Sequence, residues 1–369
     1  MKRLGLGLMR FPLLDSTNDS SVDVTVAKDM IDRFMKRGFT YFDTAYVYHG
    51  GKSEGIFGEL VAKRYPRDSY TISTKMPVWQ VKEESEYEKI FAEQLERCCV
   101  DYFDYYFLHS LDDEVYETEI GKKSFEFIKK KKAEGKVKKM CFSFHDTAEV
   151  LDKILTENPE MEMVLLQINY VDWEDEKIQS RLCYEVCMKH GKEVAIMEPV
   201  KGGNLANLPE KAQSILKGVR PDMSCASWGI RFAASLDNVH VVLSGMSSVE
   251  QIEDNMNTMD NFEKLTEAEL KAVEETVSII NDSIAVPCTS CRYCVEGCPK
   301  KIDIPKYFDV YNKQNQFGLQ PRHQGDFNSV AKNGGKPSEC IGCKQCENHC
   351  PQHLHIIEEL KKVAEIFEK

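Results

Sequence analysis

Eight cysteines after residue 287 have a spacing that could hold metal. They form two matching runs, each with three cysteines at two-residue gaps and a fourth directly before a proline: Cys288, Cys291, Cys294 and Cys298, then Cys340, Cys343, Cys346 and Cys350. Three thiolates from one tight loop can bind a compact iron–sulfur cube, and the fourth must come from elsewhere. The repeat therefore predicts two [4Fe-4S] clusters.

The fourth cysteine of each run is the one that could bind the opposite cluster. In two-cluster ferredoxins the two fourth cysteines are exchanged in this way. We therefore expect Cys350 to complete the first cluster and Cys298 the second. Zinc is the alternative, but its usual sites are two CxxC pairs or mixtures of cysteine and histidine. The third close cysteine and the Cys-Pro ending favour iron–sulfur.

The segment at about 280–369 resembles dicluster ferredoxin-like domains. Its two runs are separated by a helical pattern at 304–317 and a Gly- and Asn-rich stretch at 327–339, which we predict to be a loop. Apolar residues at helical spacing predict a last helix within 353–369. We expect a small, mainly α-helical domain with two [4Fe-4S] clusters.

A second group of reactive residues lies in the first 275 residues. Asp43, Lys75 and His109 end three successive β-rich segments, and Tyr48 follows the first of them. A nearby buried ammonium is expected to lower the Tyr48 pKa from about 10, because it stabilises the phenolate. Asp43 would keep Lys75 charged, and His109 could donate a hydrogen bond to a carbonyl oxygen. These residues predict a proton donor and a polar pocket for carbonyl reduction.

The elements that must position these residues alternate between strands and helices. The predicted strands cover 4–9, 39–43, 70–75, 104–108, 137–143, 163–168, 193–197 and 240–244. Such alternation favours a parallel sheet with right-handed crossovers, and eight repeats predict a (β/α)8 TIM barrel over 1–275, followed by the domain at 280–369. A doubly wound open sheet is the alternative. Gly5 and Gly7, however, lack the third glycine of its phosphate-binding turn.

The segments FDTAYVY, STK and FLHS resemble strand ends of the aldo-keto reductase family. The likeness covers about residues 1–260 and includes 51–54. It implies that Tyr48 is the general acid/base, that Lys75 tunes its pKa, that Asp43 pairs with Lys75, and that His109 orients the carbonyl group. Tyr46 does not match the motif. The implied substrate is a small carbonyl compound or alcohol.

The resemblance also implies a nicotinamide, NAD(P)H, across the barrel mouth. The matching positions are Ser143, Gln167, Met197, Ser244, Gly245, Gln251 and Asn255. Met197 stands where the family has a stacking tyrosine, and Gly245 and Gln251 stand where it has basic residues for a 2′-phosphate. We therefore expect a weak preference for NADPH. A flavin at the mouth is a further hypothesis, because clusters pass electrons singly and nicotinamides transfer hydride.

Composition limits the cellular setting. The 369 residues are 42% hydrophobic and 29% charged, which is typical of soluble globular proteins. No apolar run reaches the roughly 20 residues that span a bilayer, and the net charge of −12 disfavours nucleic acid. No cleavage site follows the N-terminus, so we expect no signal peptide and a cytoplasmic location. The other six cysteines are predicted to lie in the core: Cys98, Cys99, Cys141, Cys183, Cys187 and Cys225.

Three functions fit these residues. The first is an oxidoreductase that interconverts a carbonyl and an alcohol while its clusters exchange electrons with a redox partner such as a ferredoxin. The second is an ordinary NAD(P)H-dependent carbonyl reductase with structural clusters. The third is an electron-transfer module with an inactive barrel. The lysine run at Lys129–Lys132 is predicted to be a solvated helix face, with docking of an acidic ferredoxin as the alternative.

Overall fold

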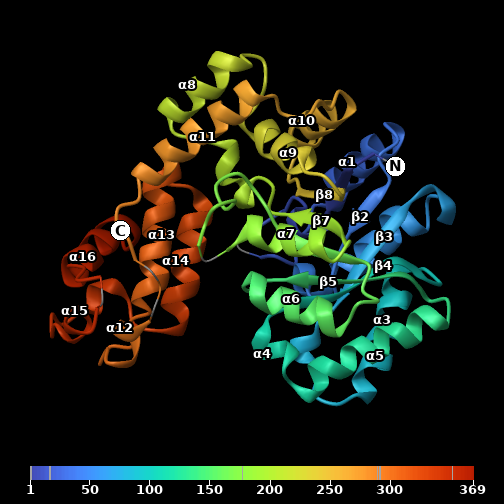
Figure 1. Cartoon of the computed structure of the whole chain (residues 1–369), viewed down its shortest axis with the longest axis horizontal. Helices are drawn as coiled ribbons and strands as arrows, with labels where there is room; N and C mark the ends of the chain where they lie inside the picture. The colour runs from blue at the N-terminus through green and yellow to red at the C-terminus, as the bar shows by residue number, and fades with distance from the viewer. Residues whose placement is uncertain (1, 16–17, 177, 289, 291, 351) are drawn as a thin grey trace. The chain divides into compact units, whose positions relative to one another are not determined.

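The chain forms two compact units in a computed structural model that describes residues 2–15, 18–176, 178–288, 290, 292–350 and 352–369 (Figure 1). The barrel unit comprises Met1–Gly203 and Ala226–Thr266, and the helical unit comprises Asn204–Cys225 and Glu267–Lys369. Residues 204–225 group with the helical unit because α8 (Glu210–Val219) packs along α11 (Glu267–Asp282). The predicted boundary between the two domains, at residues 275–280, differs from this division of the structure into two units. It remains a prediction about which residues fold together.

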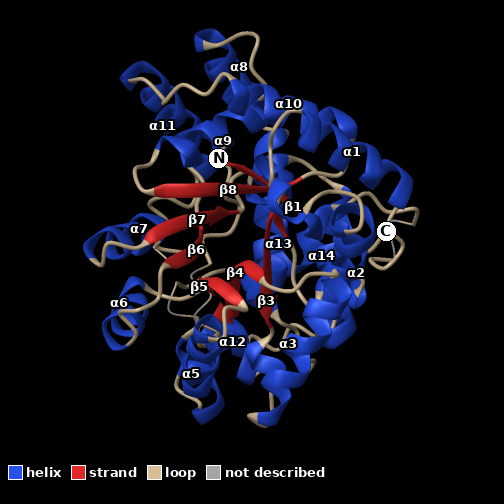
Figure 2. Cartoon of the chain, turned by 90° about the vertical axis from the view of Figure 1, so that its right-hand side faces the viewer, coloured by secondary structure: helices blue, strands red, loops and turns tan. Residues whose placement is uncertain are grey.

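The barrel unit is a closed barrel of eight parallel strands in sequence order, drawn in red in Figure 2. The strands are β1 (Leu4–Gly7), β2 (Tyr41–Asp43), β3 (Thr71–Met76), β4 (Phe103–Leu111), β5 (Val137–Phe144), β6 (Met163–Gln167), β7 (Glu193–Met197) and β8 (Val239–Gly245). Because β8 pairs with β1, the sheet closes and the open-sheet alternative is excluded. The predicted TIM barrel and its eight strands are confirmed.

Helices pack around the strands of the barrel unit. They are α1 (Val24–Lys36), α2 (Ser53–Phe57), α3 (Ser85–Cys98), α4 (Asp113–Tyr116), α5 (Glu119–Ala133), α6 (Ala148–Glu157), α7 (Ser180–Lys189), α9 (Cys225–Ser235) and α10 (Val249–Asp260). Asp23 starts α1 as a side-chain cap, since its carboxylate accepts from the N–H groups of Thr25 and Val26. Five of the six predicted core cysteines are buried. The prediction is wrong for Cys99, which is exposed and ends α3 in a left-handed conformation (φ 54°).

Close packing inside the barrel explains the first glycine of β1. A Cβ atom at Gly5 would lie 2.6 Å from Leu243 Cδ2 and 2.9 Å from Val241 Cγ2. Both neighbours belong to a buried interior cluster that also includes Tyr41 and Phe107. Gly5 therefore makes room for large side chains from the neighbouring strands and has no part in a phosphate-binding turn.

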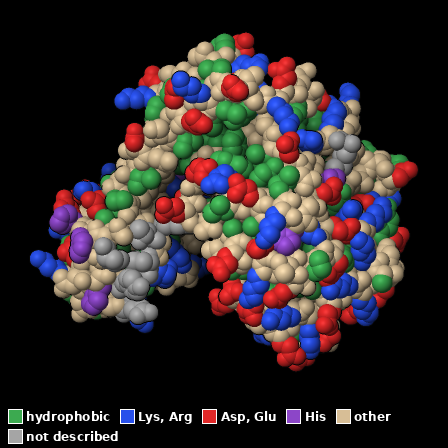
Figure 3. Space-filling model, viewed as in Figure 1, with side chains coloured by type: hydrophobic (Ala, Val, Ile, Leu, Met, Phe, Trp, Pro, Cys, Tyr) green, Lys and Arg blue, Asp and Glu red, His purple; other side chains and the backbone are tan. Residues whose placement is uncertain are grey.

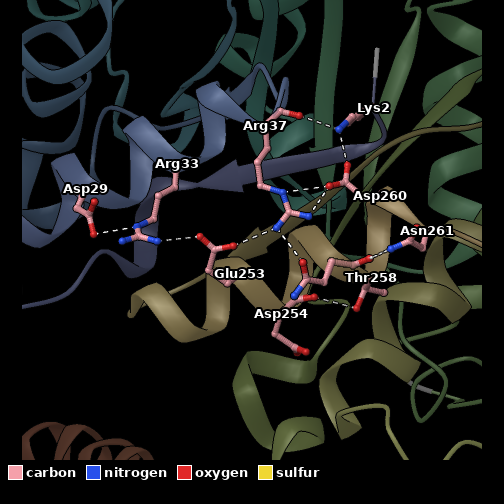
Figure 4. Close-up of polar contacts among 10 residues, drawn as sticks. Lys2, Asp29, Arg33, Arg37, Glu253, Asp254, Thr258, Asp260 and Asn261 are labelled. Carbon is pink, nitrogen blue, oxygen red and sulfur yellow. Dashed lines mark hydrogen bonds and ion pairs between the residues drawn. The ribbon is translucent and has the colours of Figure 1, made fainter.

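A network of ion pairs fixes α10 against α1 (Figure 4). Arg37 Nη1 donates to Glu253 Oε2 at 3.0 Å, and Arg37 Nε donates to Asp260 Oδ2 at 3.0 Å. Arg33 Nη1 reaches the other oxygen of Glu253 at 3.1 Å. An exposed pair alone stabilises a fold by at most about 1 kcal/mol, but shared partners hold the helix at several points. The network therefore positions α10, which carries the candidate cofactor residue Asn255.

In its described residues, the helical unit contains α8, α11 and five further helices. These are α12 (Tyr293–Glu296), α13 (Ile304–Phe317), α14 (Pro321–Asn333), α15 (Gln345–Asn348) and α16 (Ile356–Phe367). The predicted mainly helical character is confirmed. The predicted loop is wrong for 327–333, which belongs to α14. Pro321 begins this helix, and Phe327 is buried between Tyr307 and Phe367, so packing outweighs the weak helix propensity of the Asn-rich segment. Within the described ranges, no helix combines the length and apolar character needed to cross a membrane.

Replacing Phe327 with alanine is expected to destabilise the helical unit by about 3–5 kcal/mol. The ring is 2% exposed and stacks on Phe367 at 5.2 Å between centroids, so its removal leaves a cavity. Denaturant unfolding followed by cluster absorbance measures the change. Leu319→Ala is the control, because Leu319 is 60% exposed and its truncation should change stability by less than about 0.5 kcal/mol. Equal unfolding midpoints for the two variants would show that α14 does not depend on this packing.

Candidate active site and cluster cavities

Asp43 and Lys75 form a buried ion pair at the ends of β2 and β3. Lys75 Nζ donates to Asp43 Oδ2 at 2.6 Å and to the Thr44 carbonyl oxygen at 2.7 Å. Ser73 Oγ donates to the second Asp43 oxygen at 2.7 Å, so both buried charges have partners. Burial lowers the pKa of Lys75, but the Asp43 carboxylate and Tyr48 outweigh it and hold the pKa above its usual value. Lys75 therefore carries a fixed positive charge beneath the barrel mouth.

Tyr48 lies directly over this charge. Lys75 Nζ is 4.8 Å from the centre of the Tyr48 ring. Burial raises the pKa of Tyr48, and it exceeds the lowering effect of the Lys75 charge, so the pKa lies above 10. The expectation of a lowered pKa is therefore wrong, although Lys75 acts with the predicted sign. At neutral pH Tyr48 is a protonated phenol that is able to donate.

The turn that carries Tyr48 is anchored by its neighbour His49. Residues Tyr48–Gly51 form one short turn, in which His49 has a positive φ of 53°. The His49 ring is 2% exposed, with Nε2 2.8 Å from the Leu8 carbonyl oxygen and Nδ1 2.7 Å from the Asp19 carbonyl oxygen. These bonds hold the strained turn and fix the direction of Tyr48. Sequence reasoning missed His49, because only the fold brings Leu8 and Asp19 beside it.

His109, near the end of β4, faces Tyr48 across the mouth. The two rings meet edge to face with centroids 5.9 Å apart, and Trp79 lies against the other side of His109 at 4.9 Å. Burial lowers the pKa of His109 well below 6.5, and the Lys75 charge lowers it further. His109 Nδ1 is buried without a hydrogen-bond partner among the described residues. A neutral imidazole with an unused nitrogen can serve as a partner for a polar ligand.

The four predicted residues Asp43, Tyr48, Lys75 and His109 therefore converge at one end of the barrel. Tyr46 points elsewhere: its hydroxyl donates to Glu93 Oε2 at 2.8 Å, and Arg97 lies over its ring at 4.3 Å. This matches the sequence interpretation, in which Tyr46 stands outside the motif.

A buried polar network behind Lys75 had no specific sequence signal. Glu54 Oε1 accepts hydrogen bonds from Thr74 Oγ1 at 2.6 Å and from Gln94 Nε2 at 2.7 Å. Gln94 Nε2 also donates to the Lys75 carbonyl oxygen at 3.0 Å. Burial raises the pKa of Glu54, and these donors oppose the rise. The network supports the backbone that carries Lys75.

The candidate nicotinamide residues lie at the ends of β5, β6 and β7. Ser143 Oγ accepts a hydrogen bond from the Ser110 N–H at 2.6 Å and so ties β5 to the residue after His109. Gln167 and Met197 are paired across β6 and β7, and the Gln167 amide donates to Asp172 at 2.9 Å. Met197 is partly exposed at the strand end. A partly exposed thioether level with a polar amide fits one face of an aromatic ring.

The residues at the end of β8 are held by one another. Asn255 Nδ2 donates to Ser244 Oγ at 2.9 Å, and Gln251 Oε1 accepts from the Ser247 N–H at 2.7 Å. A Cβ atom at Gly245 would lie 2.8 Å from Arg10 Cδ, so the arginine stem lies along the glycine.

Arg10 is a basic side chain that the sequence comparison with the family did not place here. Its Nη2 lies 3.4 Å from Glu198 Oε1, which partly neutralises it. The first turn of α10 contributes the acidic residue Glu250. The charged side chains of this region thus include one paired guanidinium and one carboxylate.

The cysteines gather around two separate cavities in the helical unit. One is lined by the sulfur-bearing residues Cys298, Cys340, Cys343 and Cys346. The other is lined by Cys288, Cys294 and Cys350. Cys291 lies outside the described residues. Each cavity combines one run with the fourth cysteine of the other run, and Ile304 lines both.

The loops around the two cavities repeat each other in backbone conformation. Cys340 follows Cys288 by 52 residues, and positive φ angles recur at the same offset: Ser290 (58°) and Gly342 (66°), Arg292 (64°) and Lys344 (61°), Lys301 (52°) and His353 (50°). The short helices α12 and α15 keep this offset too. Left-handed residues turn the chain sharply, so that each run can wrap around one centre.

The donor set suits a multi-iron cube. In the described part of the chain, no three histidine, cysteine or carboxylate side chains converge as they would on one metal ion. The cysteines surround cavities instead, and backbone N–H groups point at sulfur: Ser290 N lies 3.4 Å from Cys288 Sγ, and Ile302 N lies 3.5 Å from Cys298 Sγ. Such bonds stabilise the anionic thiolates of a cluster.

Known proteins resemble both units. The aldo/keto reductase family matches residues 3–278, and the 4Fe-4S dicluster domain matches residues 287–355. The uncharacterized oxidoreductase YqkF of Bacillus subtilis is 23% identical over 283 residues, which are 67% of this chain and 86% of that protein. The probable aldo-keto reductase 1 of Glycine max is 34% identical over 111 residues, covering 28% of this chain and 30% of that protein.

Solved structures share the fold of the barrel unit. An aldo-keto reductase from Bacillus halodurans, in its holo form, has a TM-score of 0.60 and 21% identity, covering 74% of this chain and 91% of that one. One from Klebsiella pneumoniae, solved with NADP and acetate, has a TM-score of 0.60 and 18% identity, covering 74% and 90%. These relatives give no support to a flavin. The chain belongs to the aldo/keto reductase family of oxidoreductases and carries a 4Fe-4S dicluster domain at its C-terminal side.

Proposed function

We propose that the protein interconverts a small carbonyl compound and its alcohol at the barrel mouth, with Tyr48 as general acid/base, while two [4Fe-4S] clusters exchange electrons with a partner. One observation supports the barrel chemistry most directly. A protonated phenol, a buried ammonium and a neutral imidazole with an unused nitrogen converge at the end where TIM barrels carry their active sites.

The proton moves at the Tyr48 hydroxyl. In the reductive direction Tyr48 gives its proton to the carbonyl oxygen, and Lys75 stabilises the phenolate that remains. His109 donates a hydrogen bond to the same oxygen and fixes its position. Asp43 holds Lys75 in place and charged throughout. Trp79 packs against the His109 ring and limits its movement.

A reduced nicotinamide, when bound, supplies the hydride for this reaction. Ser143, Gln167 and Met197 would hold its ring end, and residues from Ser244 to Asn255 would hold its adenosine end. The Klebsiella enzyme, solved with NADP, supports a cofactor of this type.

The contacts at the adenosine end change the expectation from a weak preference for NADPH to a preference for NADH, by about tenfold or more in kcat/KM. The 2′-phosphate gains little from Arg10, which is paired with Glu198, and it is repelled by Glu250. Steady-state rates with the two cofactors, at equal and low ionic strength, test this. Glu250→Arg should reduce the preference for NADH, because it adds a cation at the start of α10 that can bind the 2′-phosphate of NADPH. A wild-type preference for NADPH would contradict this account of the adenosine end.

The clusters supply one-electron storage when bound. Cys288, Cys291, Cys294 and Cys350 would hold one, and Cys340, Cys343, Cys346 and Cys298 the other. The mixed lining of the two cavities supports this exchange of fourth cysteines.

The reductive kcat/KM should be independent of pH between about pH 7 and 9 and fall only above about pH 10. Reduction needs protonated Tyr48 and neutral His109; the Tyr48 pKa lies above 10, and the His109 pKa lies well below 6.5. Alcohol oxidation needs the phenolate instead, so its rate should rise with pH. Profiles in both directions, corrected for stability, check these signs. A fall in the reductive kcat/KM as the pH drops through about 6.5 would show that the pKa of His109 is not lowered, and would contradict its assignment as a neutral donor.

Turnover by anaerobically purified, cluster-loaded protein tests the proposed function. A panel of aldehydes and ketones is offered with NADH alone, with a reduced acidic ferredoxin alone, and with both. Carbonyl reduction that depends on NADH supports the barrel chemistry, and oxidation or reduction of the clusters by the ferredoxin supports the electron exchange. If no aldehyde or ketone is reduced with NADH, with the ferredoxin or with both, the barrel is inactive and the proposed function is wrong.

A further inference from the structure

We call the cavity lined by Cys288, Cys294 and Cys350 the first cavity, and the one lined by Cys298, Cys340, Cys343 and Cys346 the second. One edge of the second cavity reaches the surface. Ile341, between Cys340 and Cys343, is 61% exposed, and Cys343 is exposed as well. Both line the cavity, together with Lys300. Cys346, on the inner side, is only 7% exposed. A cluster held here would lie behind a thin apolar edge, where an electron could enter from another protein.

Four lysines lie on or beside the chain segments that form this cavity, and we call them the lysine rim: Lys300, Lys301, Lys336 and Lys344. A parallel bridge between Ile302 and Gly335 places the segment of Lys300 and Lys301 beside the segment that leads to Lys336, and Lys344 directly follows Cys343. All four are exposed, and none forms an ion pair with another described residue.

The acidic groups near the rim are engaged in local contacts. The Glu339 carboxylate accepts from the Lys336 N–H at 2.8 Å, and Glu347 Oε1 accepts from the Ile357 N–H at 3.0 Å. Asp303 pairs with Arg292 and Lys306. The four lysines of the rim thus stand against the two nearby carboxylates of Glu339 and Glu347, in a chain whose net charge is −12.

The internal repeat supplies a comparison within the same chain. At the offset of 52 residues, Lys300 and Lys301 correspond to Gln352 and His353, and Lys344 corresponds to Arg292. Gln352 lines the first cavity as Lys300 lines the second. Arg292 Nη1 lies 3.3 Å from Asp303 Oδ1 and shares this carboxylate with Lys306. Two loops of the same backbone thus differ in charge, and the unpaired cations belong to the second.

Other basic stretches of the chain consist mainly of lysines and arginines that form ion pairs. Over the face of the barrel unit in Figure 3, basic and acidic side chains are intermixed. Within the Lys129–Lys132 run, Lys130 and Lys131 pair with Glu88, and Lys132 pairs with Glu162. That run is therefore not a free docking patch for an acidic protein.

The groove between α13 and α14 contains mostly paired charges. Lys306, Lys313 and Arg322 line it and pair with Asp303, Asp309 and Asp326 respectively, and Lys301 of the lysine rim lines it as well.

We propose that the lysine rim is the docking surface for a small acidic one-electron carrier protein and that electrons cross at the Ile341 edge. In each encounter the carrier loses one electron and the cluster bound by Cys340, Cys343, Cys346 and Cys298 gains one. This proposal rests on the cluster part of the proposed function. Unpaired lysines attract and orient an acidic surface, and the exposed Ile341 provides the apolar contact at its centre.

Binding of a purified acidic plant-type [2Fe–2S] ferredoxin tests the surface. Anaerobic calorimetry at low salt compares the loaded wild type with the double variant Lys300→Glu/Lys344→Glu. We expect the double variant to bind about tenfold more weakly, and wild-type binding to weaken as salt rises. The control is Lys36→Glu/Lys89→Glu, which changes two exposed lysines of the barrel unit without ion pairs and should bind as wild type. Iron and sulfide content of each variant shows that its clusters are intact.

Three results would overturn the proposal: no binding of the acidic ferredoxin to the wild type, equal binding by the rim and control variants, or tighter binding of a basic cytochrome c. None of these would affect NADH-dependent carbonyl reduction, which measures the barrel chemistry separately. Conversely, Tyr48→Phe should bind the ferredoxin as wild type does, even without turnover.

Discussion

Replacing Tyr48 with phenylalanine is expected to lower kcat for carbonyl reduction by about 10²- to 10⁴-fold. The substitution removes the hydroxyl that donates the proton and keeps the ring that packs against His109 and lies over Lys75. Substrate and cofactor should still bind, so KM should change much less than kcat. Steady-state kinetics under anaerobic conditions, with iron and sulfide content measured in parallel, separate the chemical step from damage to the protein.

Tyr46→Phe is a matched control for this change. It removes a hydroxyl two residues away that binds Glu93 and does not face the mouth. We expect close to wild-type kcat from this variant. If Tyr46→Phe loses turnover and Tyr48→Phe keeps it, the assignment of the acid/base is wrong. If both keep it, neither tyrosine is the acid/base.

Replacing Cys298 with alanine is expected to remove one cluster and to lower the iron content from roughly eight to four atoms per chain. The cluster that disappears should be the one held by the second run, because Cys298 lines a cavity with Cys340, Cys343 and Cys346. Cys99→Ala is the control, since Cys99 lies in the barrel unit, and it should retain roughly eight irons.

Double variants decide which cavity Cys298 serves. If the fourth cysteines are exchanged, Cys298→Ala/Cys340→Ala should lose no more iron than Cys298→Ala alone, because both residues bind the same cluster. Cys298→Ala/Cys288→Ala should lose both clusters. The reverse pattern would mean that each run binds its own cluster, and the exchange would be refuted.

Much of the architecture followed from local patterns. Eight apolar segments separated by amphipathic helices permit few topologies, so the closed barrel could be predicted before its strand pairing was known. Strand ends lie next to one another in such a barrel. Asp43, Lys75 and His109 could therefore be expected at one mouth despite their distance in sequence. The cysteine runs were equally informative, because their spacing reflects the shape of the group they bind.

The rest depends on tertiary contacts that local patterns do not encode. Residues 327–333 look like a polar loop, but burial of Phe327 makes them helical. The Tyr48 pKa depends on a balance between burial and the Lys75 charge, and the sequence indicates only the second of these. Arg10 meets Gly245 because β1 and β8 close the barrel, so their contact has no signal along the chain.

Transfer of deuterium is the most direct test of the barrel chemistry. Anaerobic, cluster-loaded protein is mixed with a carbonyl substrate and NADH labelled with deuterium at C4, and the alcohol is analysed by mass spectrometry and NMR. We expect one deuterium on the former carbonyl carbon in the wild type, and no product from Tyr48→Phe on the same timescale. Each of the two hydrogens at C4 of NADH is labelled in turn. If the alcohol contains no deuterium in either experiment, direct hydride transfer from a nicotinamide at the barrel mouth, beside Tyr48 and His109, is contradicted.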